Sequence, residues 1–300
     1  MNIKKLKLEL FYLKKAFLVY KKGFKYIYNK YILAPKILKS GKVFDRPINN
    51  ENLSIHILTC HRDLVMLIWS LASFYKNLKI VGQLFIHNDG SLTDGDKKKI
   101  KELFPSVEII DSQNFEEDFA ARLDKFPVIK EFRNKYPQYV LLKKIVDPYF
   151  VSDKDYRLII DSDLLWFDSS AEIETEVLSG CNKSFMMSTD VSCPVYFKHE
   201  KFDDRLSVFN SGIVLYHKDN FDTEKFSHYL TLLDLENPEN KHFIEQAGYS
   251  YSLKNLASLP RSRYIAKGRV GQGVVMRHYT SPRRVLFYTE GLDLLKKDYV

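Results

Sequence analysis

The sequence has few cysteines and no long apolar run. Its three cysteines, Cys60, Cys181 and Cys193, lie far apart, with no C-x-x-C pair and no histidine at ligand spacing. This scarcity excludes a disulfide framework and a spaced zinc motif, and it favours a reducing, cytosolic compartment. No run of about twenty apolar residues is present to span a bilayer, and lysines interrupt the N-terminal stretch too often for a secretory signal. We therefore expect a cytoplasmic protein.

A uniformly basic surface is also absent, although the formal net charge is +8. Residues 1–46 hold 13 Lys and Arg against 2 Asp and Glu, a net charge of +11, whereas the other 254 residues carry −3. The basic charge thus belongs to an N-terminal segment. A general nucleic-acid surface is excluded, and we expect no nucleic-acid partner.

The basic segment has the pattern of one amphipathic helix of about 30 residues. The apolar side of this helix has three possible partners: its own domain, a second copy in a homo-oligomer, or the inner face of an anionic membrane as a peripheral contact. We expect residues 1–50 to form a helical arm and linker, and residues 51–300 to form the main domain. The apolar line consists of Ile3, Leu6, Leu10, Leu13, Phe17, Tyr20, Phe24, Ile27 and Tyr31.

Strand-like and helix-like segments alternate after the linker. Strand-like runs "LSIHILT", "IVGQLFIHN", "VEIID" and "YRLIID" are separated by helix-like stretches such as "LVMLIWSLASFY" and "YVLLKKIVDPYF". This alternation predicts an α/β fold with a mostly parallel sheet flanked by helices. The runs end on "TCHRD", "HNDGS" and "DSD", and the carboxyl ends of parallel strands are where such sheets bind ligands.

Three D-x-D triplets occur, and only one follows an apolar strand. Asp94-Gly-Asp96 opens a charged helix and Asp153-Lys-Asp155 lies in a polar turn, so both are expected to be solvated structure. Asp161 and Asp163 stand between "RLII" and "LLWF". Carboxylates in such a restricted place need a cation, and oxygen ligands suit Mg²⁺ or Mn²⁺. The alternative is a turn at the end of a strand in which one acid caps the next segment.

A second stretch, "RLSVFNSGIVLYH", places Asn-Ser-Gly before a strand-like run, and we expect a small, polar turn at the same rim. Together with the D-x-D triplet it resembles the GT-A fold glycosyltransferases, in particular glycogenin-like and galactosyltransferase-like members. The resemblance spans roughly residues 53–295. It implies a GT-A, Rossmann-like domain that uses Mn²⁺ or Mg²⁺ and a nucleotide-diphosphate sugar, with a UDP-sugar favoured.

The resemblance also implies roles for single residues. Asp161, Asp163 and His278 match metal ligands. Asn210, Glu245, Gln246 and Asp190 are expected around the transferred sugar and acceptor. The residues implied to bind the nucleotide-sugar are Thr59, His61, Arg62, Asn88, Asp89, Lys143 or Lys144, Ser162, Ser211 and Arg283, the last in a basic cluster with Arg277 and Arg284.

The expected reaction is transfer of a sugar to a hydroxyl of a glycan, lipid or protein acceptor. A metal and fixed cations stabilise the departing diphosphate. Inversion also needs a general base, for which Glu245, Asp190 and Asp168 are candidates; the N-S-G resemblance leans towards retention. Two alternatives stay open: a metal-dependent phosphohydrolase or nucleotidyltransferase, and a non-catalytic, membrane-associated binding protein with a degenerate transferase domain.

Overall fold

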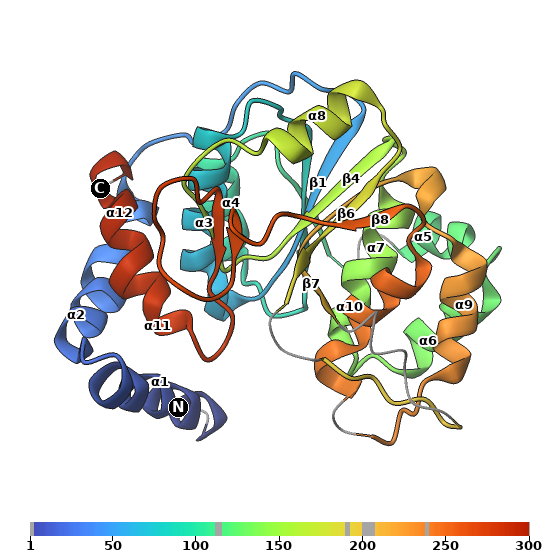
Figure 1. The fold of residues 1–300 in the computed structure, drawn as a ribbon, viewed down its shortest axis with the longest axis horizontal. Coiled ribbons are helices and arrows are strands. Elements are labelled where there is room, and N and C mark those ends of the chain that lie inside the picture. The colour runs from blue at the N-terminus through green and yellow to red at the C-terminus, as the bar shows by residue number, and fades with distance from the viewer. Residues whose placement is uncertain (1–2, 112–115, 190–192, 200–207, 238–239, 300) are drawn as a thin grey trace.

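The computed structural model describes residues 3–111, 116–189, 193–199, 208–237 and 240–299 (Figure 1). Within these ranges, seven strands form one sheet in the order β3-β2-β1-β4-β7-β6-β8. The strands are β1 (Leu53–Thr59), β2 (Gln83–Asn88), β3 (Glu108–Ile110), β4 (Tyr156–Ile160), β6 (Ser184–Ser188), β7 (Phe209–His217) and β8 (Leu256–Ser258). All neighbouring pairs are parallel except the two that involve β7.

Side chains of the central strands alternate between two hydrophobic cores, because successive residues of a strand point to opposite faces. In β4, Leu158 and Ile160 join one core and Ile159 joins the other. The first core is covered by α3 (Leu64–Asn77), α4 (Asp94–Leu103), α8 (Ala171–Ser179) and α12 (Leu292–Tyr299). The second is covered by α5 (Glu116–Leu123), α6 (Pro127–Lys135), α7 (Lys143–Val151), α9 (Thr223–Leu232) and α10 (Asn240–Ser252). The predicted fold class is therefore confirmed.

A small second sheet follows the central strand. It contains β5 (Leu164–Trp166), β9 (Tyr264–Ile265) and β10 (Met276–His278), in the order β5-β10-β9. β10 runs antiparallel to β5, with His278 opposite Leu164. A short helix, α11 (Arg284–Leu286), comes after β10. This pairing brings the C-terminal part of the chain to the end of β4.

The N-terminal arm is helical, but the prediction of one continuous helix is wrong. The arm comprises α1 (Ile3–Lys14) with a π-helical extension over Lys15–Val19, then α2 (Gly23–Tyr28), a second π-helical turn over Asn29–Leu33 and a 3-10 turn over Ala34–Lys39. The break lies at Lys21, whose φ of 53° is incompatible with a right-handed helix. At Gly23, a Cβ would meet the Phe17 ring at 2.4 Å, so glycine permits the close return of the chain.

The arm packs against its own domain through a different face from the one the sequence pattern indicated. Tyr12, Ala16 and Tyr26 are buried in the first core, and Trp69 Nε1 donates a hydrogen bond to the Ala34 carbonyl oxygen at 3.0 Å. Asn29 Nδ2 donates to the Tyr288 carbonyl oxygen at 2.5 Å. Of the nine residues of the predicted apolar line, seven are exposed, and only Leu13 and Tyr20 are half-buried against the first core. The division at residue 50 stays a prediction.

No helix in the described ranges combines the length and the apolar content needed to cross a membrane.

Candidate divalent-cation and donor site

The site begins where β4 ends. Asp161-Ser162-Asp163 forms the turn from β4 into β5, and two backbone hydrogen bonds fix its ends: the Asp161 N–H donates to the Gly212 carbonyl oxygen and the Tyr279 N–H donates to the Asp163 carbonyl oxygen, both at 3.0 Å. Of the other two D-x-D triplets, Asp153-Lys-Asp155 lies at the surface, as predicted, whereas the prediction of solvated acids is wrong for Asp96, which is buried while Asp94 is exposed. Thr93, with Asp96, caps α4, and Asp153 and Asp155 pair with surface cations.

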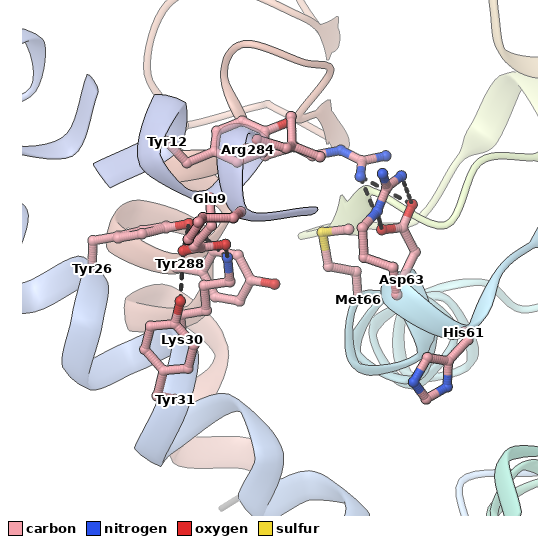
Figure 2. Close-up of a pocket in the computed structure, with 13 residues that line it drawn as sticks. Glu9, Tyr12, Tyr26, Lys30, Tyr31, His61, Asp63, Met66, Arg284 and Tyr288 are labelled. Carbon is pink, nitrogen blue, oxygen red and sulfur yellow. Dashed lines mark hydrogen bonds and ion pairs between the residues drawn. The ribbon is translucent and has the colours of Figure 1, made fainter. Parts of the chain in front are cut away.

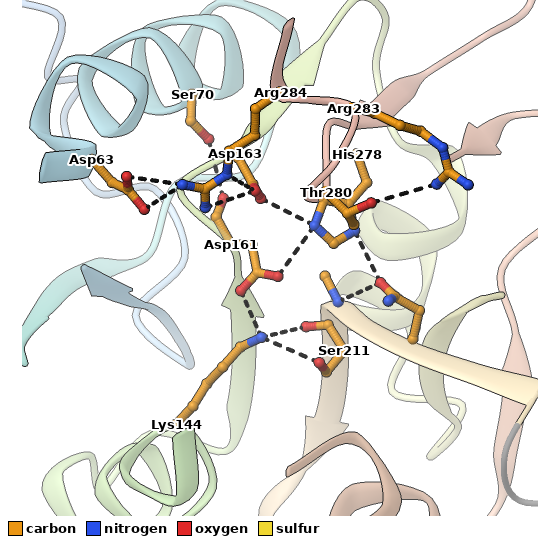
Figure 3. A network of polar contacts seen from close by, with 12 residues as sticks. Asp63, Ser70, Lys144, Asp161, Asp163, Ser211, His278, Thr280, Arg283 and Arg284 are labelled. Atoms are coloured by element: carbon orange, nitrogen blue, oxygen red, sulfur yellow. Dashed lines mark hydrogen bonds and ion pairs between the residues drawn. The ribbon is translucent and has the colours of Figure 1, made fainter. Parts of the chain in front are cut away.

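Asp161, Asp163 and His278 converge in three dimensions (Figure 3). His278 Nε2 lies 3.3 Å from Asp161 Oδ2 and 3.0 Å from Asp163 Oδ1. Burial by itself lowers the pKa of His278, but the carboxylates of Asp163 and Asp161 outweigh it and raise that pKa to about 9. Burial raises the pKa of Asp161, whereas Lys144 and His278 more than compensate and hold it far below its usual range.

The three side chains fit a divalent cation. One ligand atom from each lies within 4.8 Å of the other two. Two ligands held about 2.1 Å from a hard cation at right angles are about 3.0 Å apart, close to the 3.0 and 3.3 Å between His278 Nε2 and the two carboxylates. His278 Nδ1 lies 3.0 Å from Asn210 Oδ1, so Nδ1 keeps a proton, and the Nε2 lone pair would face a cation that displaced the second proton of the ring.

Lys144, and not Lys143, is the lysine of α7 that reaches the site. Its Nζ lies 2.6 Å from Asp161 Oδ1 and 2.8 Å from Glu245 Oε1, and it donates to the Ser211 carbonyl oxygen at 2.7 Å. These three contacts use all three N–H donors of the ammonium group. Burial lowers the pKa of Lys144, but Asp161 and Glu245 outweigh it and raise that pKa above its usual value. Lys143 is half-buried beside it.

Arg284 is a second fixed cation at the rim. Its Nη2 lies 3.0 Å from Asp163 Oδ2, and its Nη1 donates to both carboxylate oxygens of Asp63, at 2.9 and 3.0 Å. Arg62 Nε donates to the same carboxylate at 2.9 Å. Burial raises the pKa of Asp63, but Arg62 and Arg284 together hold it below its usual range. The carboxylate of Asp63 therefore holds two guanidinium groups, of which that of Arg284 also contacts the D-x-D turn.

The Asn-Ser-Gly segment is not a turn, and that prediction is wrong. All three residues lie in β7, where the pairing with β6 shifts from Met186–Val214 to Met187–Asn210 and leaves a bulge. The bulge lets the strand continue while its first residues face His278. Gly212 is required there because a Cβ would lie 2.4 Å from His278 Nδ1.

The residues expected around the donor nucleotide lie at the ends of β1 and β2, as their positions predicted, and most are already engaged. Thr59 is buried, with no partner for its hydroxyl among the described residues. His61 Nδ1 lies 2.7 Å from Asp96 Oδ2. Asn88 Oδ1 accepts from the backbone of Gly90 and Leu92. Asp89 Oδ1 accepts from the N–H and hydroxyl of Ser91.

The remaining expected residues fall in four groups. Glu245, Ser162 and Ser211 are buried at the rim, and Gln246 is buried with its Nε2 unpaired among the described residues. Arg283 turns to Thr280 Oγ1 at 3.4 Å, and Arg277 pairs with Glu290 away from the acids. Asp168 is exposed. Asp190 lies outside the described residues. Of the basic cluster, only Arg284 contacts the triad in the described structure.

Sequence reasoning gave no role to Asp63. The segment "TCHRD" marks the end of a strand. The signal for Asp63 is its position at the start of a strongly apolar helix, where an acid is otherwise unexpected. Arg284 was recognised only as one of three clustered arginines. The contact between them joins residues 221 positions apart, which a single sequence does not reveal.

A cavity of about 410 Å³ lies between the arm and this rim (Figure 2). Tyr12, Tyr26 and Tyr288 give it aromatic walls, and Arg62, Asp63 and Arg284 line it on the domain side. On the arm side, Glu9 pairs with Lys30 and accepts a hydrogen bond from the Tyr31 hydroxyl at 2.6 Å. Arg284 thus contacts both the cavity and the Asp161–Asp163 turn. Aromatic walls with polar ends suit a flat or ring-shaped ligand group.

Comparisons with known proteins give structural neighbours only. No protein-family model matches the chain, and no curated protein matches it in sequence. The bifunctional glycosyltransferase WbbM is 11% identical, with a TM-score of 0.48, over 79% of this chain and 47% of its own, so the chain spans about half of that protein. Mouse xyloside xylosyltransferase 1 is 14% identical, with a TM-score of 0.44, over 76% of this chain and 97% of its own.

A third neighbour is an active-site variant of the galactosyltransferase LgtC, at 14% identity and a TM-score of 0.48, over 76% of this chain and 88% of its own. All three are glycosyltransferases, the class that the sequence resembles.

Proposed function

We propose that this chain is a metal-dependent glycosyltransferase that moves a sugar from a nucleotide-diphosphate donor, foremost a UDP-sugar, to a hydroxyl of a glycan, lipid or protein. The observation that carries the proposal is the convergence of Asp161, Asp163 and His278 beside two fixed cations, Lys144 and Arg284. A divalent cation, Mg²⁺ or Mn²⁺, suits the two carboxylates and the imidazole nitrogen.

The charge balance of the rim supports an anionic ligand. Four carboxylates, those of Asp63, Asp161, Asp163 and Glu245, face the cations Arg62, Lys144, Arg284 and protonated His278. The raised pKa of His278, about 9, keeps it charged at neutral pH when no metal is bound. A divalent cation that replaces this proton leaves one excess positive charge, which favours a diphosphate.

Each residue then has a distinct task. Asp161, Asp163 and the Nε2 of His278 would hold the cation, which would supply positive charge to stabilise a leaving diphosphate. Arg284 presents a planar guanidinium beside the same position and suits phosphate oxygens. Lys144 ties Asp161 to the bulged start of β7, so that the ligand oxygens keep their places.

We further propose that transfer proceeds with retention of the anomeric configuration. Of the three expected general bases, Glu245 is buried and bound to Lys144 at 2.8 Å, Asp168 is exposed beyond β5, and Asp190 lies outside the described residues. A base that accepts the acceptor proton must lie within hydrogen-bond reach of that hydroxyl and keep a free lone pair. Glu245, already held by a cation, is poorly suited to that role. NMR analysis of the product's anomeric centre tests this proposal.

The first experiment is thermal shift of the purified chain against UDP-, GDP-, CMP- and dTDP-sugars, with and without Mn²⁺. A ligand that binds only the folded state raises the melting temperature. We expect one nucleotide class to do so only with Mn²⁺, and not in Asp163→Asn. The matched control, Asp153→Asn, changes an exposed D-x-D acid and keeps the shift.

Product analysis then separates the reaction classes. A transferase releases the nucleoside diphosphate and joins the sugar to an acceptor. Release of inorganic phosphate or of a sugar phosphate instead would identify a phosphohydrolase or nucleotidyltransferase. Failure of every donor to shift the melting temperature would favour a degenerate domain that binds no donor.

A further inference from the structure

The arm presents a second apolar face, which does not contact the domain. Twelve of the sixteen exposed large apolar side chains in the described part of the chain lie in residues 3–32. Phe24 is 83% exposed, Leu18 66% and Val19 62%. Scattered single apolar residues are ordinary on a protein surface, but a contiguous concentration marks a binding surface. Leu6 and Tyr31 line the cavity between the arm and the rim, and we call the other ten the outer face: Ile3, Leu10, Phe11, Phe17, Leu18, Val19, Phe24, Ile27, Tyr28 and Ile32.

Cations surround the outer face and acids do not. Lys7, Lys14, Lys21 and Lys22 are exposed, and no carboxylate in the described ranges pairs with them. Glu9 is the one acid in the first 44 residues. It is half-buried and turned to the cavity side, where it pairs with Lys30. The outer face therefore combines apolar side chains with unbalanced positive charge.

We infer that the outer face binds the surface of a lipid bilayer that contains anionic headgroups. Apolar side chains enter the headgroup boundary while flanking lysines meet the negative surface potential. A second copy of the chain fits less well, because two outer faces would bring two sets of unpaired lysines together. This inference goes beyond the proposed transfer reaction and does not depend on it.

The turn between α1 and α2 is the part of the outer face that we expect to insert. Phe17 and Phe24 stand on either side of it with ring centroids 5.5 Å apart, and Gly23 lets the two chain segments approach. Leu18 and Val19 precede the turn, and Lys21 and Lys22 lie within it. In Figure 1 this turn is at the edge of the molecule, away from the central sheet.

Tryptophan fluorescence gives a direct test. Both native tryptophans, Trp69 and Trp166, are fully buried at 0% exposure, so a tryptophan introduced by Phe24→Trp reports its own surroundings. We expect its emission to shift to the blue with vesicles of mixed phosphatidylglycerol and phosphatidylcholine. The matched variant Leu178→Trp, at a 69% exposed position on α8, should not shift. An unchanged emission of Phe24→Trp at saturating lipid overturns the inference.

Vesicle flotation of matched variants separates the contribution of the lysines to lipid binding from that of the apolar side chains. Each lysine near an anionic surface changes the partition coefficient about fivefold, so Lys21→Gln/Lys22→Gln should lower it about 25-fold. Leu18→Ser/Phe24→Ser should lower the partition coefficient at least as far. Two double variants at exposed positions of the main domain are the controls, Lys183→Gln/Lys225→Gln for charge and Leu178→Ser/Leu294→Ser for apolar area. Neither control should change the partition coefficient. Binding should weaken in phosphatidylcholine alone and at high salt.

Two results contradict the inference. Equal flotation of wild type, arm variants and body controls would place the lipid contact elsewhere. A wild-type dimer in solution that becomes monomeric in Leu18→Ser/Phe24→Ser, without flotation of either form, would assign the outer face to a second copy of the chain.

Discussion

Charged side chains are usually exposed and apolar ones buried. The rim of the sheet departs from the first rule, and the N-terminal arm departs from the second. At the rim, Asp63, Asp163, Lys144 and Glu245 are charged groups that are buried. On the arm, Phe24 and Leu18 are apolar groups that are exposed. Each arrangement costs free energy when no ligand is bound. The ligand that we propose for the rim is a cation with an anionic donor, and for the arm it is a lipid surface.

The largest effect is expected where a buried charge loses its partner. Lys144→Met leaves Asp161 and Glu245 without their shared cation, and removal of one partner from a buried pair costs about 3–5 kcal/mol. Urea unfolding should show this loss of stability, together with loss of any Mn²⁺-dependent donor binding. Lys143→Met is the matched control on the same helix and should change stability by about 0.5 kcal/mol or less. Equal effects of both variants would contradict the account of the rim.

A change that adds one methyl group tests the geometry of the rim. In Gly212→Ala the new Cβ would lie 2.4 Å from His278 Nδ1, so the imidazole must move. Disturbing the residue that orients a metal ligand lowers metal affinity by about 10–100-fold, which calorimetric titration with Mn²⁺ would measure. Gly271→Ala, where a Cβ meets nothing within 4 Å, is the control. Unchanged Mn²⁺ affinity in Gly212→Ala would exclude His278 from the ligand set.

Buried groups away from the rim should respond to pH. Burial, with Lys143 and Arg133 nearby, lowers the pKa of His87 to about 3, and burial and His87 hold the pKa of His56 well below its usual value. His56 Nδ1 lies 2.9 Å from His87 Nε2, and both are buried in the sheet.

The unfolded chain takes up protons at these histidines below pH 6.5 and the folded chain does not, so stability is lost as pH falls from 6.5 towards 3. At pH 5.5 the loss is about 1.4 kcal/mol for each histidine. Urea unfolding at pH 7.5 and 5.5 should show a smaller pH effect in His56→Leu/His87→Leu than in wild type. The exposed control His228→Leu should keep the wild-type difference; the same pH effect in all three would refute this assignment.

The smallest effect is expected on the outer face. Phe24→Ser replaces a side chain that contributes little to the core, so stability should change by about 0.5 kcal/mol or less. Tyr26, two residues away on α2, is 1% exposed, and Tyr26→Ser should cost about 3 kcal/mol because it leaves a cavity. Thermal unfolding of both variants measures the contrast. A large loss in Phe24→Ser would mean that the outer face supports the fold.

The sequence predicted the sheet and the position of Asp161 and Asp163 at the end of a buried strand, because both depend on local patterns; that these acids bind a metal stays a prediction. Alternating strands and helices, and acids that directly follow buried Leu158, Ile159 and Ile160, are visible along the chain. The triplets at Asp94 and Asp153 lack that strand; Asp153 and Asp155 pair with surface cations, and Asp96 takes part in the capping of α4.

Features that depend on contacts between distant segments could not be predicted. Lys144 is distinguished from Lys143 by Asp161 and Glu245, and Arg284 from Arg283 by Asp63. The arm shows the limit most clearly. Its strongest apolar periodicity marks the outer face, while small or polar side chains such as Ala16 and Asn29 fit against the domain. Periodicity identifies an apolar line but not what it contacts.

The measurement that tests the account most directly is Mn²⁺ binding to the purified chain, followed by electron paramagnetic resonance at pH 7.5. We expect one bound ion per chain in wild type and in the exposed control Asp153→Asn. Asp163→Asn and His278→Ala should each weaken binding at least tenfold while circular dichroism shows an intact fold. Binding of equal strength in all four proteins would show that the Asp161–Asp163–His278 triad is not a metal site.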